Sequence, residues 1–122
     1  MDDGYVHEKR YIILHMDDDT VTTCVINSQI SQFVRSRSTL LKCQVEMDAN
    51  THAFMDRTSH VDCSRTWVYS TDSVVEELVG RTDWILGTIT AGLRDHLVAA
   101  FKFAQTLSST DVNTIAEALR LI

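Results

Sequence analysis

The feature that most constrains the fold of this chain is a change in hydrophobic period close to residue 72. Residues 5–70 contain short runs of β-branched and aromatic residues, separated by polar segments that are typical of turns. From residue 72 onward, apolar residues recur at the three- and four-residue spacing of amphipathic helices. The sequence therefore predicts an α+β fold, in which a small curled β-barrel or sheet is followed by C-terminal helices that cover it.

Four strands are predicted in the first part of the chain. They cover residues 11–15, 21–26, 40–47 and 59–69. Three consecutive aspartates at positions 17–19 supply the turn between the first two strands, which indicates a hairpin. In the fourth segment, which is one strand or a strand pair, the apolar residues predict one buried face formed by Val61, Cys63, Trp67 and Tyr69.

The last third of the chain predicts helices and one further strand. Asp72 and Ser73 are expected to cap a short helix that Gly80 ends. An apolar run at residues 84–89 predicts a short strand. Residues 91–107 carry an apolar stripe that predicts a helix, and a last helix follows the capping residues 108–110.

Composition narrows the function classes. The chain has 122 residues and a net charge of −6, which favours a single domain over residues 1–122 and argues against a large nucleic-acid footprint. It contains no apolar run of membrane-spanning length, and its acidic start differs from a secretory signal, so we expect a cytoplasmic protein with no membrane contact. The odd number of cysteines, Cys24, Cys43 and Cys63, predicts reduced, buried thiols.

The segment from residue 59 to residue 67 is the most informative for chemistry. In an extended strand, His60, Asp62 and Ser64 share one face, and Arg65 lies on the other. A histidine next to a carboxylate can work as a general acid–base pair. The alternative is a row of solvated side chains on a half-exposed strand.

A second candidate site combines Arg10, at the start of the first strand, with Ser28, just after the second. If the two strands pair, Arg10 lies near the small polar side chains of residues 27–29, an arrangement that suits one phosphate or carboxylate. An ordinary turn is the alternative. Arg35 and Arg37 are expected in an exposed loop that either touches a polyanion or is simply solvated.

No metal or cofactor is predicted. His52, His60 and Cys63 are the residues best placed to form a zinc site, but their spacing matches no compact zinc motif. The sequence also has no glycine-rich phosphate loop and no nucleophile elbow.

In its order of elements the chain resembles the MazF/PemK-type toxins, a family of SH3-like barrels with helices after them. Arg10 precedes an apolar strand as the arginine of that family does, residues 24–29 run into a similar polar segment, and residues 59–67 match part of a family motif. Tyr11 stands where the family has proline, and Cys63 where it has glutamine.

The resemblance implies a metal-independent endoribonuclease that cleaves single-stranded RNA by attack of the ribose 2′-hydroxyl. The implied catalytic residues are Arg10, Ser28 and Asp62, with His60 as an additional acid–base group. Arg35, Arg37 and Arg65 are the implied RNA-binding residues. Whatever the function, we expect a homodimer, because a small barrel with unpaired strand edges gains by pairing them. A toxin of this kind is also expected to bind an antitoxin or another protein partner.

Two other readings remain open at this point. The first is a catalytically inactive barrel, for example one encoded by a phage or mobile element, that binds a protein partner through its acidic surface. The second is an unrelated small α+β domain with similar spacing. All the chemical readings assume that Arg10 and Asp62 face one shared pocket.

Overall fold

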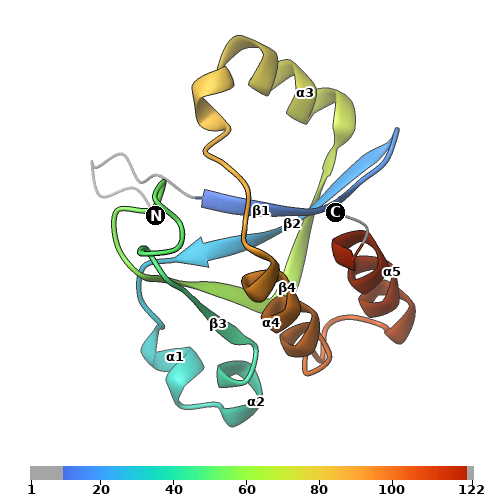
Figure 1. Ribbon diagram of the computed structural model, residues 1–122. Helices are drawn as coiled ribbons and strands as arrows, with labels where there is room; N and C mark the ends of the chain where they lie inside the picture. Colours follow the sequence, from blue (N-terminus) through green and yellow to red (C-terminus); the bar gives the residue numbers. More distant parts are fainter. Residues whose placement is uncertain (1–9, 121–122) are drawn as a thin grey trace.

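The structure, a computed structural model, describes residues 10–120 (Figure 1). Its four strands are β1 (Arg10–Met16), β2 (Thr20–Asn27), β3 (Gln44–Met47) and β4 (Ser59–Ser70). They form one antiparallel sheet in the order β1-β2-β4-β3. The long strand β4 pairs with both β2 and β3, and the sheet curls into a half-barrel.

Helices follow and flank the sheet. The helices are α1 (Gln32–Arg35), α2 (Ser38–Leu41), α3 (Thr71–Gly80), the 3₁₀ turn η1 (Thr82–Trp84), α4 (Ala91–Phe101) and α5 (Ser109–Arg120). Helices α4 and α5 contact each other and the sheet, while α3 extends from the end of β4 (Figure 1). The expected α+β architecture, a curled β-framework with helices after it, is confirmed. Among residues 10–120 no helix is long and apolar enough to cross a bilayer.

The core lies between one face of the sheet and helices α4 and α5. Alternate residues of the strands point into it, as the two-residue period of a β-strand requires. Its most deeply buried members are Leu14, Cys24, Cys43, Met47, Val61, Cys63, Leu97, Phe101 and Leu119. Burying a large aliphatic or aromatic side chain contributes roughly 1.5–3 kcal/mol, so this single apolar layer holds the helices on the sheet.

Three elements differ from the sequence-based expectations. The strand predicted over residues 40–47 begins only at Gln44, because residues 38–41 form the short helix α2. The strand predicted over residues 84–89 is absent: η1 and an extended segment occupy this stretch, which pairs with none of the four strands of the described sheet. Helix α4 ends at Phe101 instead of continuing to residue 107, although Ala104 is still buried in the core.

A buried histidine fixes the loop between β3 and β4 to the start of α4. The His52 Nδ1 atom lies 3.1 Å from the Asp48 carbonyl oxygen, and its Nε2 atom accepts a hydrogen bond from the Thr90 N–H at 3.1 Å. Thr90 in turn caps α4 through its side chain. His52 is therefore a structural residue, and within residues 10–120 no group of three or more His, Cys, Asp or Glu side chains could hold a metal ion.

The burial of the three thiols makes stability sensitive to alkaline pH. Burial raises the pKa of Cys24 to about 12, and also raises the pKa values of Cys43 and Cys63 above the ordinary value of 9.0. Above about pH 9 the unfolded chain releases thiol protons that the folded chain keeps. The free energy of unfolding should therefore fall as pH rises, by up to about 1.4 kcal/mol per pH unit for each thiol.

Urea unfolding of the wild type and of the Cys24→Ala variant at a series of pH values measures this effect. We expect a shallower alkaline decline in the variant, because one of the titrating thiols has been removed. Equal slopes in the two proteins would contradict the assignment of Cys24 as a buried, protonated thiol.

Candidate functional site: an aromatic pocket on the sheet

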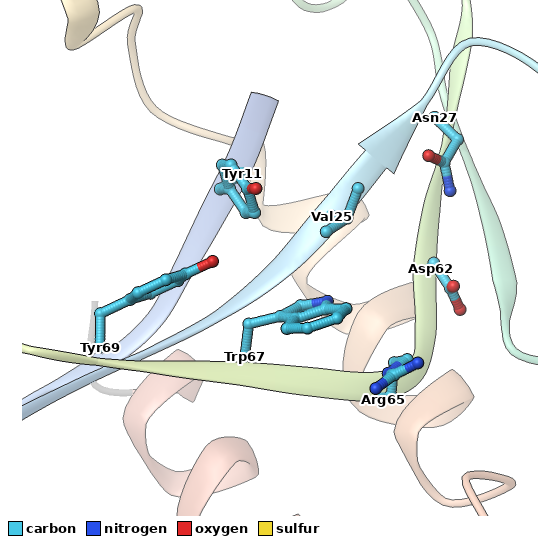
Figure 2. A pocket seen from close by; sticks show the side chains of 7 residues that line it. All are labelled: Tyr11, Val25, Asn27, Asp62, Arg65, Trp67 and Tyr69. Carbon is cyan, nitrogen blue, oxygen red and sulfur yellow. The ribbon is translucent and has the colours of Figure 1, made fainter. Parts of the chain in front are cut away.

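The face of the sheet opposite α4 and α5 carries a cavity of about 310 Å³ (Figure 2). Side chains from β1, β2 and β4 line it. They are Tyr11, Val25, Asn27, Asp62, Arg65, Trp67 and Tyr69, which we call the aromatic pocket. The hollow is shallow and open on one side, has aromatic walls and a few polar groups, and lies at the lower end of the size range of ligand pockets.

Strand register explains the first half of the pocket. Tyr11 pairs with Val25, and Val25 pairs with Asp62, so these three residues form one row across β1, β2 and β4. Residues directly opposite each other in a sheet project to the same side. The next row, which contains Arg10, Ile26 and Val61, projects to the core side.

An irregularity in β4 supplies the second half of the pocket. From Asp62 to Trp67 the strand advances five residues while its partner β2 advances two, from Val25 to Thr23. The excess of three residues is odd, and an odd insertion exchanges the two faces of a strand. Arg65, Trp67 and Tyr69 therefore project to the same side as Asp62.

The sequence-based assignment of the β4 faces is corrected by this irregularity. Arg65 was expected on the face opposite Asp62, and Trp67 and Tyr69 were expected on the buried face with Val61 and Cys63. Cys63 and Ser64 are both buried instead, because the regular alternation stops between them. The expectation that His60 and Asp62 share one face agrees with the burial pattern of β4, in which both are half-buried between buried neighbours.

The aromatic side chains are close together and half-exposed. The Tyr11 and Tyr69 rings meet edge to face with their centroids 6.2 Å apart. The Arg65 guanidinium carbon lies 4.3 Å from the centroid of the Trp67 ring, within cation–π range. Tyr11 is 44% exposed, and Trp67 and Tyr69 are each 40% exposed. Large rings that keep this much accessible surface on one side of a sheet are unusual for side chains with a purely structural role.

Desolvation and the neighbouring Tyr11 phenol change the pKa of Tyr69. Desolvation and then a side-chain hydrogen bond with Tyr11 raise the pKa of Tyr69 above its ordinary value of 10.0. The Tyr69 phenol therefore stays neutral near pH 7, where it can donate and accept hydrogen bonds.

Asp62 organises the irregular part of β4. Its Oδ1 atom accepts hydrogen bonds from Gln44 Nε2 at 3.0 Å, from the Ser64 N–H at 2.9 Å and from Ser64 Oγ at 2.6 Å. The Ser64 carbonyl accepts a further hydrogen bond from Thr106 Oγ1 at 2.7 Å. These bonds tie the departure from regular pairing to β3 and to the segment after α4.

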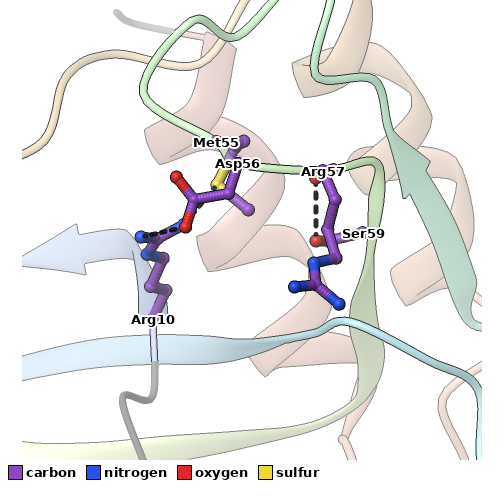
Figure 3. A network of polar contacts seen from close by, with 5 residues as sticks. All are labelled: Arg10, Met55, Asp56, Arg57 and Ser59. Carbon is purple, nitrogen blue, oxygen red and sulfur yellow. Dashed lines mark hydrogen bonds and ion pairs between the residues drawn. The ribbon is translucent and has the colours of Figure 1, made fainter.

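Arg10 does not share the aromatic pocket with Asp62. It projects to the core side of the sheet, where Nη1 lies 3.7 Å from Met55 Sδ and Nη2 lies 3.5 Å from Asp56 Oδ2 (Figure 3). Asp56 is largely exposed, so this ion pair contributes little to stability. The expectation of one pocket around Arg10 and Asp62 is wrong, because consecutive rows of a sheet face opposite sides.

The other candidate residues are dispersed. Ser28 is exposed just after the end of β2. Arg35 ends α1 and Arg37 is the N-cap of α2, so both are exposed as expected, but at two short helices and not in a loop. His60 pairs with Asn27 and with Glu46 in the register of β4. Of the candidate site residues predicted from the sequence, Asn27, Asp62 and Arg65 line the aromatic pocket.

Tyr11, Trp67 and Tyr69 were not among the site residues predicted from the sequence, and Asn27 was predicted only as part of the polar segment beside Arg10. The available signal was the concentration of a tryptophan and a tyrosine two residues apart at the end of a polar strand. This signal was interpreted as part of a buried face, because the residue pattern gives no sign that β4 changes side between Asp62 and Trp67.

Removing the Asp62 carboxylate should destabilise the protein. The Asp62→Ala variant leaves Gln44 Nε2 and both Ser64 donors without their acceptor, and we expect a loss of about 2–3 kcal/mol in the free energy of unfolding. Urea denaturation measures it, with Asp18→Ala in the exposed β1–β2 turn as a control expected to change by less than about 0.5 kcal/mol. Equal effects of the two variants would contradict the role of Asp62.

Comparisons of this chain with family models, with curated proteins and with solved structures give no match. The resemblance to MazF/PemK-type toxins therefore depends on the short motifs alone. The functional assignment below depends on the geometry of the aromatic pocket.

Proposed function

We propose that this protein is a binding module that recognises a segment of a partner protein through the aromatic pocket. The observation that carries the proposal is the cluster of three half-exposed rings, Tyr11, Trp67 and Tyr69, with Arg65 stacked on one of them. Aromatic side chains and arginine dominate the energetic centres of protein interfaces. A catalytic constellation receives less support, because Arg10 projects from the other face of the sheet.

The pocket chemistry favours an extended peptide with apolar side chains. Rings on a rigid sheet offer contact area at low entropic cost, and aromatic-lined grooves recognise extended, proline-containing segments in several binding modules. The Asn27 amide, the Arg65 guanidinium and the tyrosine hydroxyls can hydrogen-bond the peptide backbone.

Charge favours a partner with a basic residue next to its apolar ones. The β1–β2 turn carries three consecutive aspartates, Asp17, Asp18 and Asp19. The Thr71 N–H donates a hydrogen bond to the Asp19 carbonyl, which holds this turn next to the start of α3, two residues after Tyr69 of the pocket. Hydrogen bonds from the N–H groups of Thr20 and Asp19 lower the pKa of Asp17, which stays ionised. Together with the net charge of −6, this turn attracts cationic segments and repels polyanions.

Metal-independent cleavage of single-stranded RNA is the second candidate function. One observation favours it: Arg65 and Asp62 line the same pocket as Trp67, where a base could stack beside a cation and a carboxylate. In this version Arg65, and not Arg10, supplies the positive charge that faces the phosphate.

Panning a phage-displayed random peptide library against the purified protein tests the proposal. We expect selected peptides that bind the wild type, and at least about tenfold weaker binding to the Trp67→Ala variant, because the truncated ring is a central contact. Trp84→Ala is the matched control: it removes the other tryptophan, which lies outside the pocket, and should leave the affinity unchanged.

Two results would contradict the binding-module proposal. One is a set of selected peptides that bind the wild type and Trp67→Ala equally well. The other is cleavage of labelled single-stranded RNA in the presence of a chelator that is lost in Arg65→Ala, which would favour the nuclease.

A further inference from the structure

The segment of residues 71–86, which we call the acidic arm, exposes an unusual amount of apolar surface. Val79 is 74% exposed, and Val75, Trp84, Ile85 and Leu86 are also exposed. Among the ten residues of α3, all of which are described, Thr71 is the only buried one. A helix of this length is marginal without tertiary packing. Val74 and Leu78 are half-buried, whereas the side formed by Val75 and Val79 lacks the contacts that normally stabilise such a helix.

The charges of the acidic arm have one dominant sign. Asp72, Glu76 and Glu77 lie on α3, and Asp83 lies in η1. At the helical period, Asp72 and Glu76 flank the stripe formed by Val75 and Val79. Arg81 is the single basic residue of the arm, and its guanidinium is stacked 4.5 Å from the Trp84 ring centroid.

A second exposed apolar patch has the opposite charge. We call it the basic end, and it consists of Phe33, Arg35, Arg37, Leu41, Lys42, Lys102 and Phe103. The Arg37 guanidinium carbon lies 3.7 Å from the centroid of the Phe33 ring. Lys42 Nζ lies 5.6 Å from the centroid of the Phe103 ring, and this contact connects the end of α2 with the end of α4. Residues 28–42 include no Asp or Glu, and neither α1 nor α2 has a buried side chain.

The two patches lie at opposite ends of the molecule. In Figure 1, α3 is at the top of the sheet, and α1 and α2 are at the bottom. The two patches are thus too far apart to meet within one chain. Complementary surfaces on different sides of a protomer form head-to-tail contacts, in contrast to the self-complementary patch of a two-fold dimer.

We infer that the occupant of the acidic arm is the basic end of a second copy of this chain. Val75, Val79 and Trp84 of one copy pack on Phe33, Leu41 and Phe103 of the next. Glu76 and its acidic neighbours face Arg35, Arg37 and Lys42 across the contact. The inference is independent of the proposed peptide binding, because neither patch contains a residue of the aromatic pocket.

Sedimentation velocity over a concentration series tests this contact with two variants of exposed residues. Val79→Lys disables the acidic arm, and Phe33→Asp disables the basic end. We expect the wild type to associate with rising concentration, more weakly at high salt, and each variant alone to sediment as a monomer. An equimolar mixture of the two variants should form a complex of twice the monomer mass and nothing larger, because each keeps the patch that the other lacks.

Two controls keep the result interpretable. Circular dichroism and thermal unfolding establish that both variants are folded, and Val68→Lys introduces the same charge at an exposed site outside both patches and should associate like the wild type. The inference is overturned if the wild type stays monomeric at every concentration, if only one variant loses association, or if the mixed variants fail to pair.

Discussion

The aromatic pocket depends on one local constraint, the three additional residues that β4 accommodates between Asp62 and Trp67. A regular strand would send Arg65, Trp67 and Tyr69 to the core side, where α4 and α5 pack. The odd insertion places them beside Asp62 and Tyr11 instead. Asp62 is central to this arrangement, because its carboxylate accepts the hydrogen bonds that fix Ser64 and link β4 to Gln44 of β3.

The alternation of side chains along β1 also separates Arg10 from Asp62, which the sequence analysis placed in one pocket. Arg10 and Tyr11 are neighbours in β1, yet one contacts Met55 on the core side and the other lines the pocket. This separation weakens the case for a nuclease built around Arg10 and Asp62. It leaves a pocket with one cation, one carboxylate and three rings, which is better suited to holding a ligand than to transferring protons around a phosphate.

Much of the fold could be predicted from local pattern. The hairpin β1–β2, the start of α5 after its capping residue Ser108 and the buried cysteines all follow from short-range signals in the sequence. The apolar spacing of Leu93 and Leu97 likewise predicted α4, although its cap Thr90 was not predicted. The pocket could not be predicted in the same way. The change of side in β4 is held by hydrogen bonds from Gln44 and Thr106, which are distant from it in the sequence.

Within residues 10–120, α1, α2 and η1 have no buried side chain and α3 has one, that of Thr71. These elements also carry most of the two oppositely charged apolar patches. The core between the sheet and α4 and α5 does not need them. Their conformation in solution is therefore the part of the fold most dependent on contacts with other molecules.

The most direct test of the structural claim is a two-dimensional NOE spectrum of the folded protein with assigned aromatic protons. We expect cross-peaks between the Tyr11 and Tyr69 rings and between the Trp67 indole and the Arg65 side chain. Cross-peaks from the Trp67 indole to Leu119 or Leu97 would place the ring in the core. That result would contradict the change of side in β4 and the aromatic pocket with it.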